Sequence, residues 1–135
     1  MMKKLIILLV MLPFSFYAAE LDSKFVTAIH QVETGGKTGT IYGDGGKALG
    51  PFQIHHGCWR DAVEFDKSIG GSYSDCSKLD YSKKIMSAYL NRYGKPAIVS
   101  KDYETLAKIW NGGPKGASKS STQSYWMKVQ KNIKP

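Results

Sequence analysis

An amphipathic helix near the start of the chain ends on an acidic residue, and this segment constrains the fold more than any other. At about 100° per residue its apolar side chains share one arc of about 140°, and these residues are Leu21, Phe25, Val26, Ile29 and Val32. Glu33 falls inside the same arc. Asp22 or Ser23 can cap the helix, and Gly35-Gly36 ends it. The pattern predicts a helix over residues 22–33 that carries a carboxyl group on its core-facing side.

The position of Glu33 predicts a carboxyl group with a raised pKa. A carboxylate among apolar neighbours is costly to ionise, and the negative end of the helix dipole acts in the same direction. A carboxyl group that stays protonated near neutral pH can donate a proton, so Glu33 is a candidate general acid. The alternative is an ordinary solvated helix terminus beside two glycines.

The remaining pattern predicts short helices around one small β-hairpin. A strand is expected over residues 38–42, with Gly43–Gly46 as the turn. Pro51 suits the first turn of a second helix. Three further helices are expected over residues 59–65, 81–93 and 102–110, and Gly94 ends the second of these. Thr122 can cap the last helix of the chain. The fold class is therefore α+β, mostly helical, with the hairpin beside the end of the first helix.

Residues 1–19 have the features of an export signal. A positively charged start precedes a short apolar run, and Ala18-Ala19 offers small residues for cleavage. We therefore expect a signal peptide over 1–19 and a single domain over 20–135. The protein is expected to be exported, periplasmic or secreted, with no stable membrane insertion after cleavage. An uncleaved N-terminal anchor helix is the alternative.

The chain is strongly basic. Its formal net charge is +8, and loss of Lys3 and Lys4 with the signal would leave it basic. Such a charge favours anionic partners, whether cell walls, membrane surfaces or nucleic acids. No run of Lys and Arg interleaved with aromatic residues is present, so a nucleic-acid partner is not expected.

Cys58 and Cys76 are the two cysteines. In an exported protein they predict one disulfide, and two free buried thiols are the alternative. Two cysteines cannot complete a typical structural zinc site, and adjacent His55 and His56 make a poor pair of ligands for one ion. No metal is expected.

Asp44 lies eleven residues after Glu33, in the glycine-flanked turn. A hairpin that folds back on the helix would bring this carboxylate opposite Glu33. Among backbone amides and solvent, Asp44 is expected to be ionised. Glycoside hydrolysis uses such a pair, because the acid protonates the leaving oxygen while the carboxylate attacks the anomeric carbon or stabilises positive charge there. A plain turn-forming role for Asp44 is the alternative.

Five short motifs follow one another between Ile29 and Gln130, and they are ETGG, GDGGKALGPFQI, Trp59 with Asp61, YLNRYG, and IWNGGPKG followed by T..YW.KV. This ordered set resembles the invertebrate-type lysozymes, also called the destabilase family, within the lysozyme-like superfamily. The resemblance implies that Glu33 matches the family's general acid and Asp44 its second carboxylate.

The resemblance also implies an activity. A family member would be a retaining muramidase that hydrolyses the β-1,4 bond between N-acetylmuramic acid and N-acetylglucosamine, with no cofactor. The implied fold is a helical lysozyme-like domain with a small β-hairpin next to the catalytic cleft. The expected partners are peptidoglycan glycan strands and a proteinaceous lysozyme inhibitor.

Further residues are expected to bind substrate in the cleft, and these are Gln53, Tyr42, His55, Asn111, Gly112 and Gly113. Gln53 has a structural alternative, as an amide that ties the hairpin to the first helix. The segment from Asn111 to Pro114 also has a structural alternative, as a bare helix stop with no role in binding. The chain departs from the family pattern in its few cysteines, in a shorter hairpin segment, and in Trp110, where the family usually has His.

Two other functions remain open. ALGPFQI and IWNGGP also resemble motifs of lytic transglycosylases, which would work with Glu33 alone. A non-catalytic cationic protein that binds cell walls would need only the basic charge. A requirement for Asp44 would distinguish hydrolysis from the first alternative. A requirement for Glu33 would exclude the second.

Overall fold

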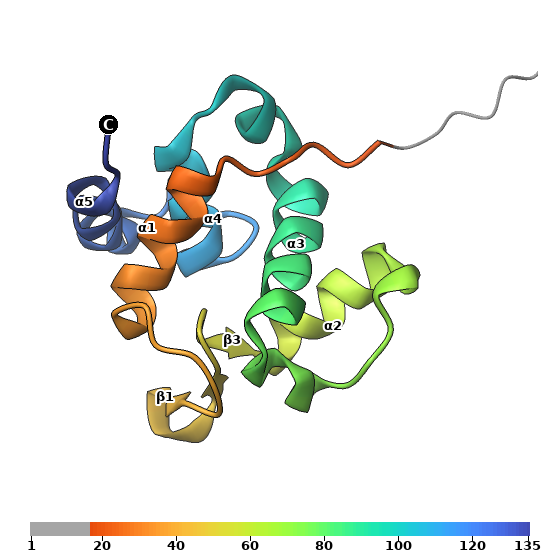
Figure 1. Ribbon diagram of the computed structural model, residues 1–135. Coiled ribbons are helices and arrows are strands. Elements are labelled where there is room, and N and C mark those ends of the chain that lie inside the picture. Colours follow the sequence, from red (N-terminus) through yellow and green to blue (C-terminus); the bar gives the residue numbers. More distant parts are fainter. Residues whose placement is uncertain (1–16) are drawn as a thin grey trace, which may run out of the picture.

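The computed structural model describes residues 17–135 (Figure 1). Most of the predicted signal peptide over 1–19 lies outside the described residues. The helices are α1 (Ser23–Thr34), α2 (His56–Phe65), α3 (Leu79–Ser100), α4 (Tyr103–Gly112) and α5 (Gln123–Asn132). The strands are β1 (Tyr42–Gly43), β2 (Ala48–Leu49) and β3 (Ile54–His55). The predicted α+β, mostly helical class is confirmed. Within residues 17–135 no helix is both long and apolar enough to cross a bilayer.

The helices surround α3, which stands at the centre of the molecule (Figure 1). Helices α1, α4 and α5 pack together on one side of it, and α2 packs on the other. The small sheet closes the gap between α1 and α2 at one end. Because the sheet follows directly on α1, it lies beside the C-terminal end of that helix, where Glu33 is.

Helix α1 begins and ends where the sequence predicts. The side chain of Asp22 accepts a hydrogen bond from the backbone N–H of Lys24. Gly35 adopts a left-handed conformation with φ 63°, and its N–H bonds back to the carbonyl of Gln31. Asp102 caps α4 in the same way, by accepting from the N–H of Thr105. Both helix starts therefore follow from local capping chemistry.

The sheet differs from the predicted hairpin. The strand lies at Tyr42–Gly43 rather than over 38–42, and it pairs with β2 in the register Tyr42 to Leu49. A second antiparallel pairing joins β2 to β3, with Ala48 opposite His55. The turn between β1 and β2 is a short 3-10 segment, η1 (Asp44–Gly46). The turn is thus close to its predicted place, whereas the strand is displaced.

Pro51 does not begin a helix, and this prediction was wrong. Gly50 and Gln53 both have positive φ, 81° and 51°, so the chain turns sharply between β2 and β3. A Cβ at Gly50 would lie 1.8 Å from the carbonyl oxygen of Cys76. This close backbone approach requires glycine, and it directs Phe52 into the core, where its side chain is fully buried.

The first helical part of α3 ends at Gly94, as the sequence predicts, and a second part follows it directly. Gly94 has φ −146° and marks a kink, after which the helix runs on through Pro96. A Cβ at Gly94 would lie 3.0 Å from Cδ1 of Ile109. The glycine therefore serves the packing of α4 against α3 as well as the break between the two helical parts.

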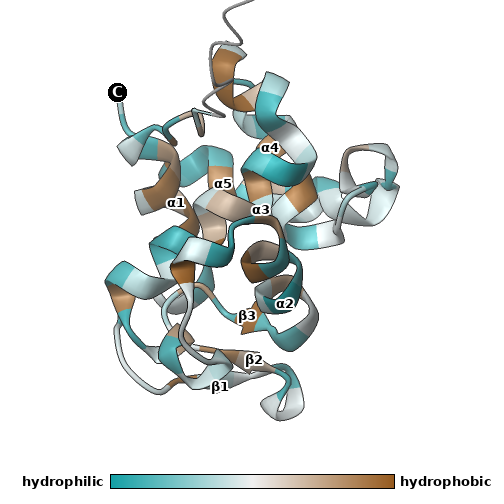
Figure 2. Cartoon of the chain, turned by 90° about the vertical axis from the view of Figure 1, so that its right-hand side faces the viewer, coloured by the Kyte–Doolittle hydropathy of each residue, from teal (hydrophilic) through white to brown (hydrophobic). Residues whose placement is uncertain are grey.

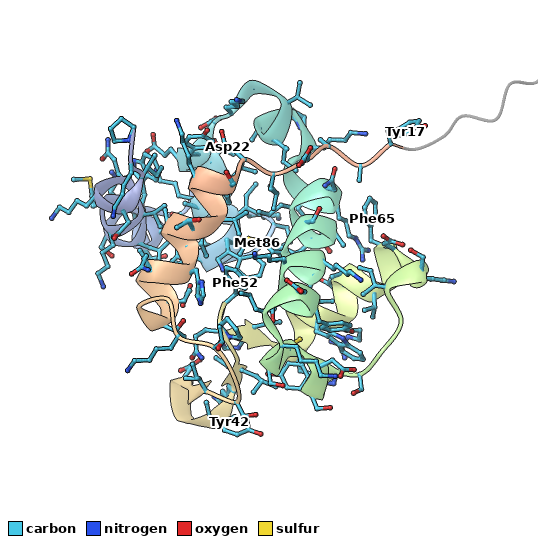
Figure 3. The ribbon with its side chains drawn as sticks, viewed as in Figure 1. Tyr17, Asp22, Tyr42, Phe52, Phe65 and Met86 are labelled. Atoms are coloured by element: carbon cyan, nitrogen blue, oxygen red, sulfur yellow. The ribbon has the colours of Figure 1, made fainter. Side chains whose placement is uncertain are left out.

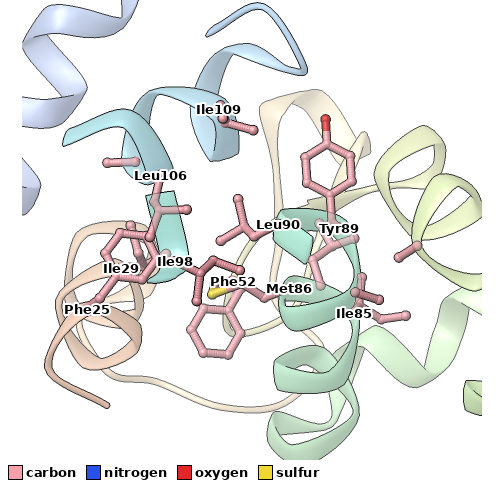
Figure 4. Close-up of a cluster of buried hydrophobic side chains, with 14 of the residues drawn as sticks. Phe25, Ile29, Phe52, Ile85, Met86, Tyr89, Leu90, Ile98, Leu106 and Ile109 are labelled. Atoms are coloured by element: carbon pink, nitrogen blue, oxygen red, sulfur yellow. The ribbon is translucent and has the colours of Figure 1, made fainter. Parts of the chain in front are cut away.

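The core gathers apolar side chains from α1, α3, α4 and the β2–β3 turn (Figure 4). Each of these helices carries both hydrophilic and hydrophobic residues, as amphipathic helices do (Figure 2). The largest members, each no more than 2% exposed, are Phe25, Ile29, Phe52, Ile85, Met86, Leu90 and Leu106. This cluster fixes the helices whose ends form the site.

No disulfide joins Cys58 and Cys76, and that prediction was wrong. Both are free cysteines, Cys76 fully buried and Cys58 half-buried. Burial raises the pKa of the Cys76 thiol to about 12 and also raises the pKa of Cys58. Both thiols are therefore protonated at neutral pH, and the cysteines behave as small apolar side chains.

Candidate active site

A cleft of about 510 Å³ opens where α1 ends, between the sheet and the end of α4. The lining residues are Glu33, Asp44, Ala48, Gln53, Ile54, His55, Cys58, Tyr89, Trp110, Asn111 and Gly113. The two candidate catalytic carboxyl groups thus share one cavity. No group of three or more His, Cys, Asp or Glu side chains within residues 17–135 is placed to hold a metal ion.

Glu33 is the second-last residue of α1 and is partly buried. Burial raises the pKa of its carboxyl group above the ordinary value of 4.5, the direction that the apolar stripe predicts. Two opposing influences lower the pKa, a hydrogen bond from Tyr125 and the charge of Lys128. The hydroxyl of Tyr125 donates to Oε1 of Glu33 over 2.7 Å. Glu33 is therefore a hydrogen-bonded carboxyl group that favours its protonated form.

Asp44 lies in the turn after β1 and is exposed to solvent. Its φ of 50° is left-handed, which is uncommon for a residue other than glycine but tolerated by aspartate. Oδ2 of Asp44 lies 3.3 Å from Nε2 of His55. The environments of Asp44 and Glu33 therefore differ, one exposed and facing a histidine, the other partly buried beside a tyrosine.

Gln53 supports the turn that carries Asp44. Its amide Nε2 donates to the carbonyls of Ile41, at 3.1 Å, and Gly50, at 3.0 Å. A Cβ on Gly43 would lie 1.9 Å from Oε1 of Gln53, so the amide packs directly on the strand. These contacts give Gln53 a structural role within the hairpin rather than between the hairpin and α1, and the residue also lines the cleft.

The loop after α4 forms the opposite rim. Asn111 and Gly113 line the cleft, whereas the carbonyl of Gly112 accepts a hydrogen bond from Nζ of Lys119 over 2.6 Å. Thr122 stands at the N-cap position of α5, as the sequence predicts, but its side chain makes no capping hydrogen bond. Its buried hydroxyl donates to the carbonyl of Gly116, at 2.9 Å, and to that of Lys119. These bonds hold the loop against α4 and so set the shape of the rim.

Two of the six predicted binding residues do not line the cleft. Tyr42 is 65% exposed and points outward at the far end of the sheet (Figure 3). Gly112 is not in the lining, and its carbonyl accepts the hydrogen bond from Lys119 described above. The other four predicted binding residues, Gln53, His55, Asn111 and Gly113, are all in the lining.

Sequence reasoning missed three aromatic contributors to the site, besides Ala48, Ile54 and Cys58 in its lining. Tyr89 and Trp110 line the cleft and meet edge to face, with ring centroids 5.9 Å apart. Tyr125 contacts Glu33 from α5. Two of the quoted motifs, YLNRYG and T..YW.KV, contain Tyr89 and Tyr125, but aromatic residues at helical spacing are more often part of a core.

The chain is similar to known proteins over most of its length. The Destabilase family profile matches residues 22–132. Lysozyme 1 of Crassostrea virginica is 32% identical over 118 residues, which cover 86% of this chain but only 62% of that protein. The lysozyme of Magallana gigas is 33% identical over 119 residues, 86% of this chain and 83% of that protein.

Solved structures agree. The lysozyme of Tapes japonica superposes with a TM-score of 0.66 at 29% identity, covering 82% of this chain and 89% of that one. The lysozyme of Meretrix lusoria, in a complex with Aeromonas hydrophila PliI, superposes with a TM-score of 0.68 at 28% identity, covering 86% and 93%. The family match spans every element from α1 to α5, and the chain therefore belongs to the Destabilase family and has a lysozyme-like fold.

Proposed function

We propose that the protein is an exported peptidoglycan muramidase, with Glu33 as general acid and Asp44 as the second carboxylate. One observation carries this proposal. The two carboxyl groups line the same cleft in unlike surroundings, since burial raises the pKa of Glu33 while Asp44 is exposed in the turn. Such a pair is what hydrolysis of a glycosidic bond requires. The relatives at about this level of identity are lysozymes, which supports the same activity.

The reaction follows from these roles. Glu33 gives its proton to the glycosidic oxygen between N-acetylmuramic acid and N-acetylglucosamine as the bond to the anomeric carbon breaks. Asp44 attacks that carbon from the other face, or stabilises the positive charge that develops there. Glu33, now a carboxylate, then takes a proton from a water molecule whose oxygen attacks the anomeric carbon and releases Asp44. The configuration at the anomeric carbon is retained.

The lining of the cleft suits a glycan strand. Polar groups of Gln53, His55 and Asn111 stand on the rim, where they can bond sugar hydroxyl and N-acetyl groups. The ring of Trp110 supplies apolar surface for a sugar face, and the buried ring of Tyr89 packs against it. The net charge of +8 favours association with an anionic cell wall.

Mass spectrometry of released muropeptides tests the proposal. The wild type should release fragments with reducing muramic acid ends, and both Glu33→Gln and Asp44→Asn should lower release by roughly 100-fold or more. Anhydro-muramic ends, with full activity in Asp44→Asn, would instead identify a lytic transglycosylase. Wall binding or killing that survives Glu33→Gln, with no fragments from any variant, would identify a non-catalytic wall-binding protein.

We also propose a proteinaceous inhibitor as a partner of this cleft. The support is that the Meretrix lusoria lysozyme, similar in fold, is known in a complex with Aeromonas hydrophila PliI. Titration of the muramidase activity with PliI tests this partner, and activity unchanged at saturating PliI would reject it.

A further inference from the structure

We propose that Tyr125 is the positioning residue of the general acid, holding one oxygen of Glu33 so that the other presents its proton to the substrate. The inference rests on the proposed function, since it concerns how Glu33 acts in the cleft. Its geometric basis is the single hydrogen bond from the Tyr125 hydroxyl to Oε1 of Glu33, 2.7 Å long, which joins residues 92 positions apart.

The second oxygen of Glu33 is left for the substrate. Within the described residues, Oε1 of Glu33 is bonded to Tyr125, and Oε2 has no hydrogen-bond partner. No side-chain oxygen or nitrogen in the described part of the chain is both buried and without a partner, so Oε2 is accessible. Glu33 lines the cleft. Because Oε1 already accepts a hydrogen bond from Tyr125, the proton of the neutral acid resides on Oε2.

Tyr125 is suited to be a permanent donor. Burial, together with the neighbouring Glu33, raises the pKa of Tyr125 well above 10, so its hydroxyl keeps its proton through any working pH. Helix α5 holds the ring firmly, because α5 packs on α1 and its Val129 is fully buried. The hydroxyl therefore stays in place when Glu33 changes its protonation state.

The hydrogen bond also assists the chemical step. A donor to a carboxylate stabilises the charge that appears when the acid gives up its proton. Loss of the bond should therefore raise the pKa of Glu33 and also leave its carboxyl group free to rotate. Lys128, on the next turn of α5, lowers the pKa of Glu33 through its charge, without a hydrogen bond. The other titratable groups that line the cleft are Asp44, His55, Cys58 and Tyr89.

A matched control lies at the other end of the same helix. The hydroxyl of Tyr103, from α4, donates to the carboxylate of Asp22, the residue that caps α1. Tyr125→Phe and Tyr103→Phe therefore remove the same atom from a tyrosine–carboxylate contact at opposite ends of α1. Both should reduce stability, whereas only Tyr125→Phe should alter the chemistry of Glu33.

The test combines pH profiles of muropeptide release with a ¹³C NMR titration of the Glu33 carboxyl group. For Tyr125→Phe we expect kcat to fall roughly 10- to 100-fold with little change in KM. The alkaline limb of the profile and the NMR midpoint of Glu33 should both move to higher pH. Tyr103→Phe should keep the wild-type kcat, limb and midpoint. A Tyr125→Phe protein with wild-type kcat and midpoint would overturn the inference.

A second variant keeps the test decisive if Tyr125→Phe does not fold. Replacing Tyr125 with 3-fluorotyrosine makes the phenol a stronger donor, so the midpoint of Glu33 should move to lower pH. No movement would overturn the inference. Because the NMR titration of Glu33 needs no substrate, it tests the role of Tyr125 independently of the muramidase activity. An inactive wild type whose Glu33 midpoint responds to Tyr125 rejects the muramidase alone, and an active wild type without that response rejects the role of Tyr125 alone.

Discussion

Asp44 and His55 meet from the two outer strands of the sheet, with Oδ2 of Asp44 3.3 Å from Nε2 of His55. Asp44 follows β1 and His55 ends β3, so the contact crosses over β2. A carboxylate at a left-handed turn position has few local restraints on its side chain. The histidine supplies one such restraint on Asp44, and both residues line the cleft.

Removing this contact should weaken activity only modestly. Both side chains are more than half exposed, 51% for His55 and 65% for Asp44, so solvent screens their attraction. We expect His55→Ala to lower kcat/KM roughly two- to fivefold at low salt and at an acidic pH where the imidazole is protonated, as for exposed ion pairs. The loss should shrink as salt is added. Steady-state kinetics on peptidoglycan at two ionic strengths would measure it.

His56 provides the control for this prediction. It is the neighbouring histidine and also exposed, but its ring packs against Trp59 and Tyr73 rather than facing Asp44. His56→Ala should keep the kinetics of the wild type at both ionic strengths. A His55→Ala enzyme that matches the wild type at low salt would show that Asp44 needs no partner.

Gly43→Ala should displace Gln53 from the hairpin. The new Cβ would lie 1.9 Å from Oε1 of Gln53, so the amide must leave and lose its bonds to Ile41 and Gly50. We expect the free energy of unfolding to fall by about 1–3 kcal/mol, together with activity, because the same turn carries Asp44. Urea unfolding measures the change.

A double variant tests the cause. Gly43→Ala combined with Gln53→Ala should be destabilised by clearly less than the two single losses together, because both changes remove the same bonds. Gly57→Ala serves as a control, since its Cβ would meet only Arg60 in ordinary contact at 3.9 Å. Full additivity in the double variant would exclude the clash as the mechanism.

Local chemistry made part of this fold predictable from sequence. The ends of α1 follow from the cap at Asp22 and from Gly35, and the start of α4 follows from Asp102. Each of these signals involves residues within a few positions of one another. The apolar stripe likewise placed Glu33 toward the core, and burial does raise its pKa.

Long-range packing decided the rest. Gly94 breaks the helix as the sequence predicts, but its missing side chain also serves contact with Ile109, which the sequence does not reveal. The strand position depends on the amide of Gln53, which no propensity reveals. The contact between Tyr125 and Glu33 joins helices at opposite ends of the chain, and periodicity shows that Tyr125 points inward without showing which helix it meets. The disulfide was inferred from the expected export, which says nothing about geometry.

The free cysteines predict indifference to redox conditions. Because Cys58 and Cys76 are not bonded to each other, a reducing agent should leave the Tm unchanged. Buried, protonated thiols should react slowly in the folded protein and fully after unfolding. Thiol titration with and without denaturant, beside thermal unfolding with and without reductant, provides the measurement. A Tm that falls on reduction would reveal a disulfide.

Glu33→Gln should stabilise the protein at neutral pH. Burial raises the pKa of Glu33 in the folded state above its ordinary value of 4.5, so the unfolded state binds fewer protons above that pH. Stability from the neutral acid is therefore complete below about pH 4 and is lost as pH rises through the folded-state pKa. Glutamine stays neutral and can still accept the hydrogen bond from Tyr125. We expect a Tm higher than that of the wild type by roughly 2–5 °C at pH 7 and equal to it near pH 4.

The pH dependence of the Tm difference between Glu33→Gln and the wild type identifies burial of Glu33 as its cause. Glu20→Gln controls for the loss of one negative charge from a basic protein, because Glu20 is exposed. Its Tm difference from the wild type should not grow between pH 4 and pH 7. A Glu33→Gln protein less stable than the wild type at pH 7 would mean that the ionised carboxylate contributes to folding. In that case the carboxyl group would not be held as an acid at the expense of stability, and the general-acid role would lose its physical basis.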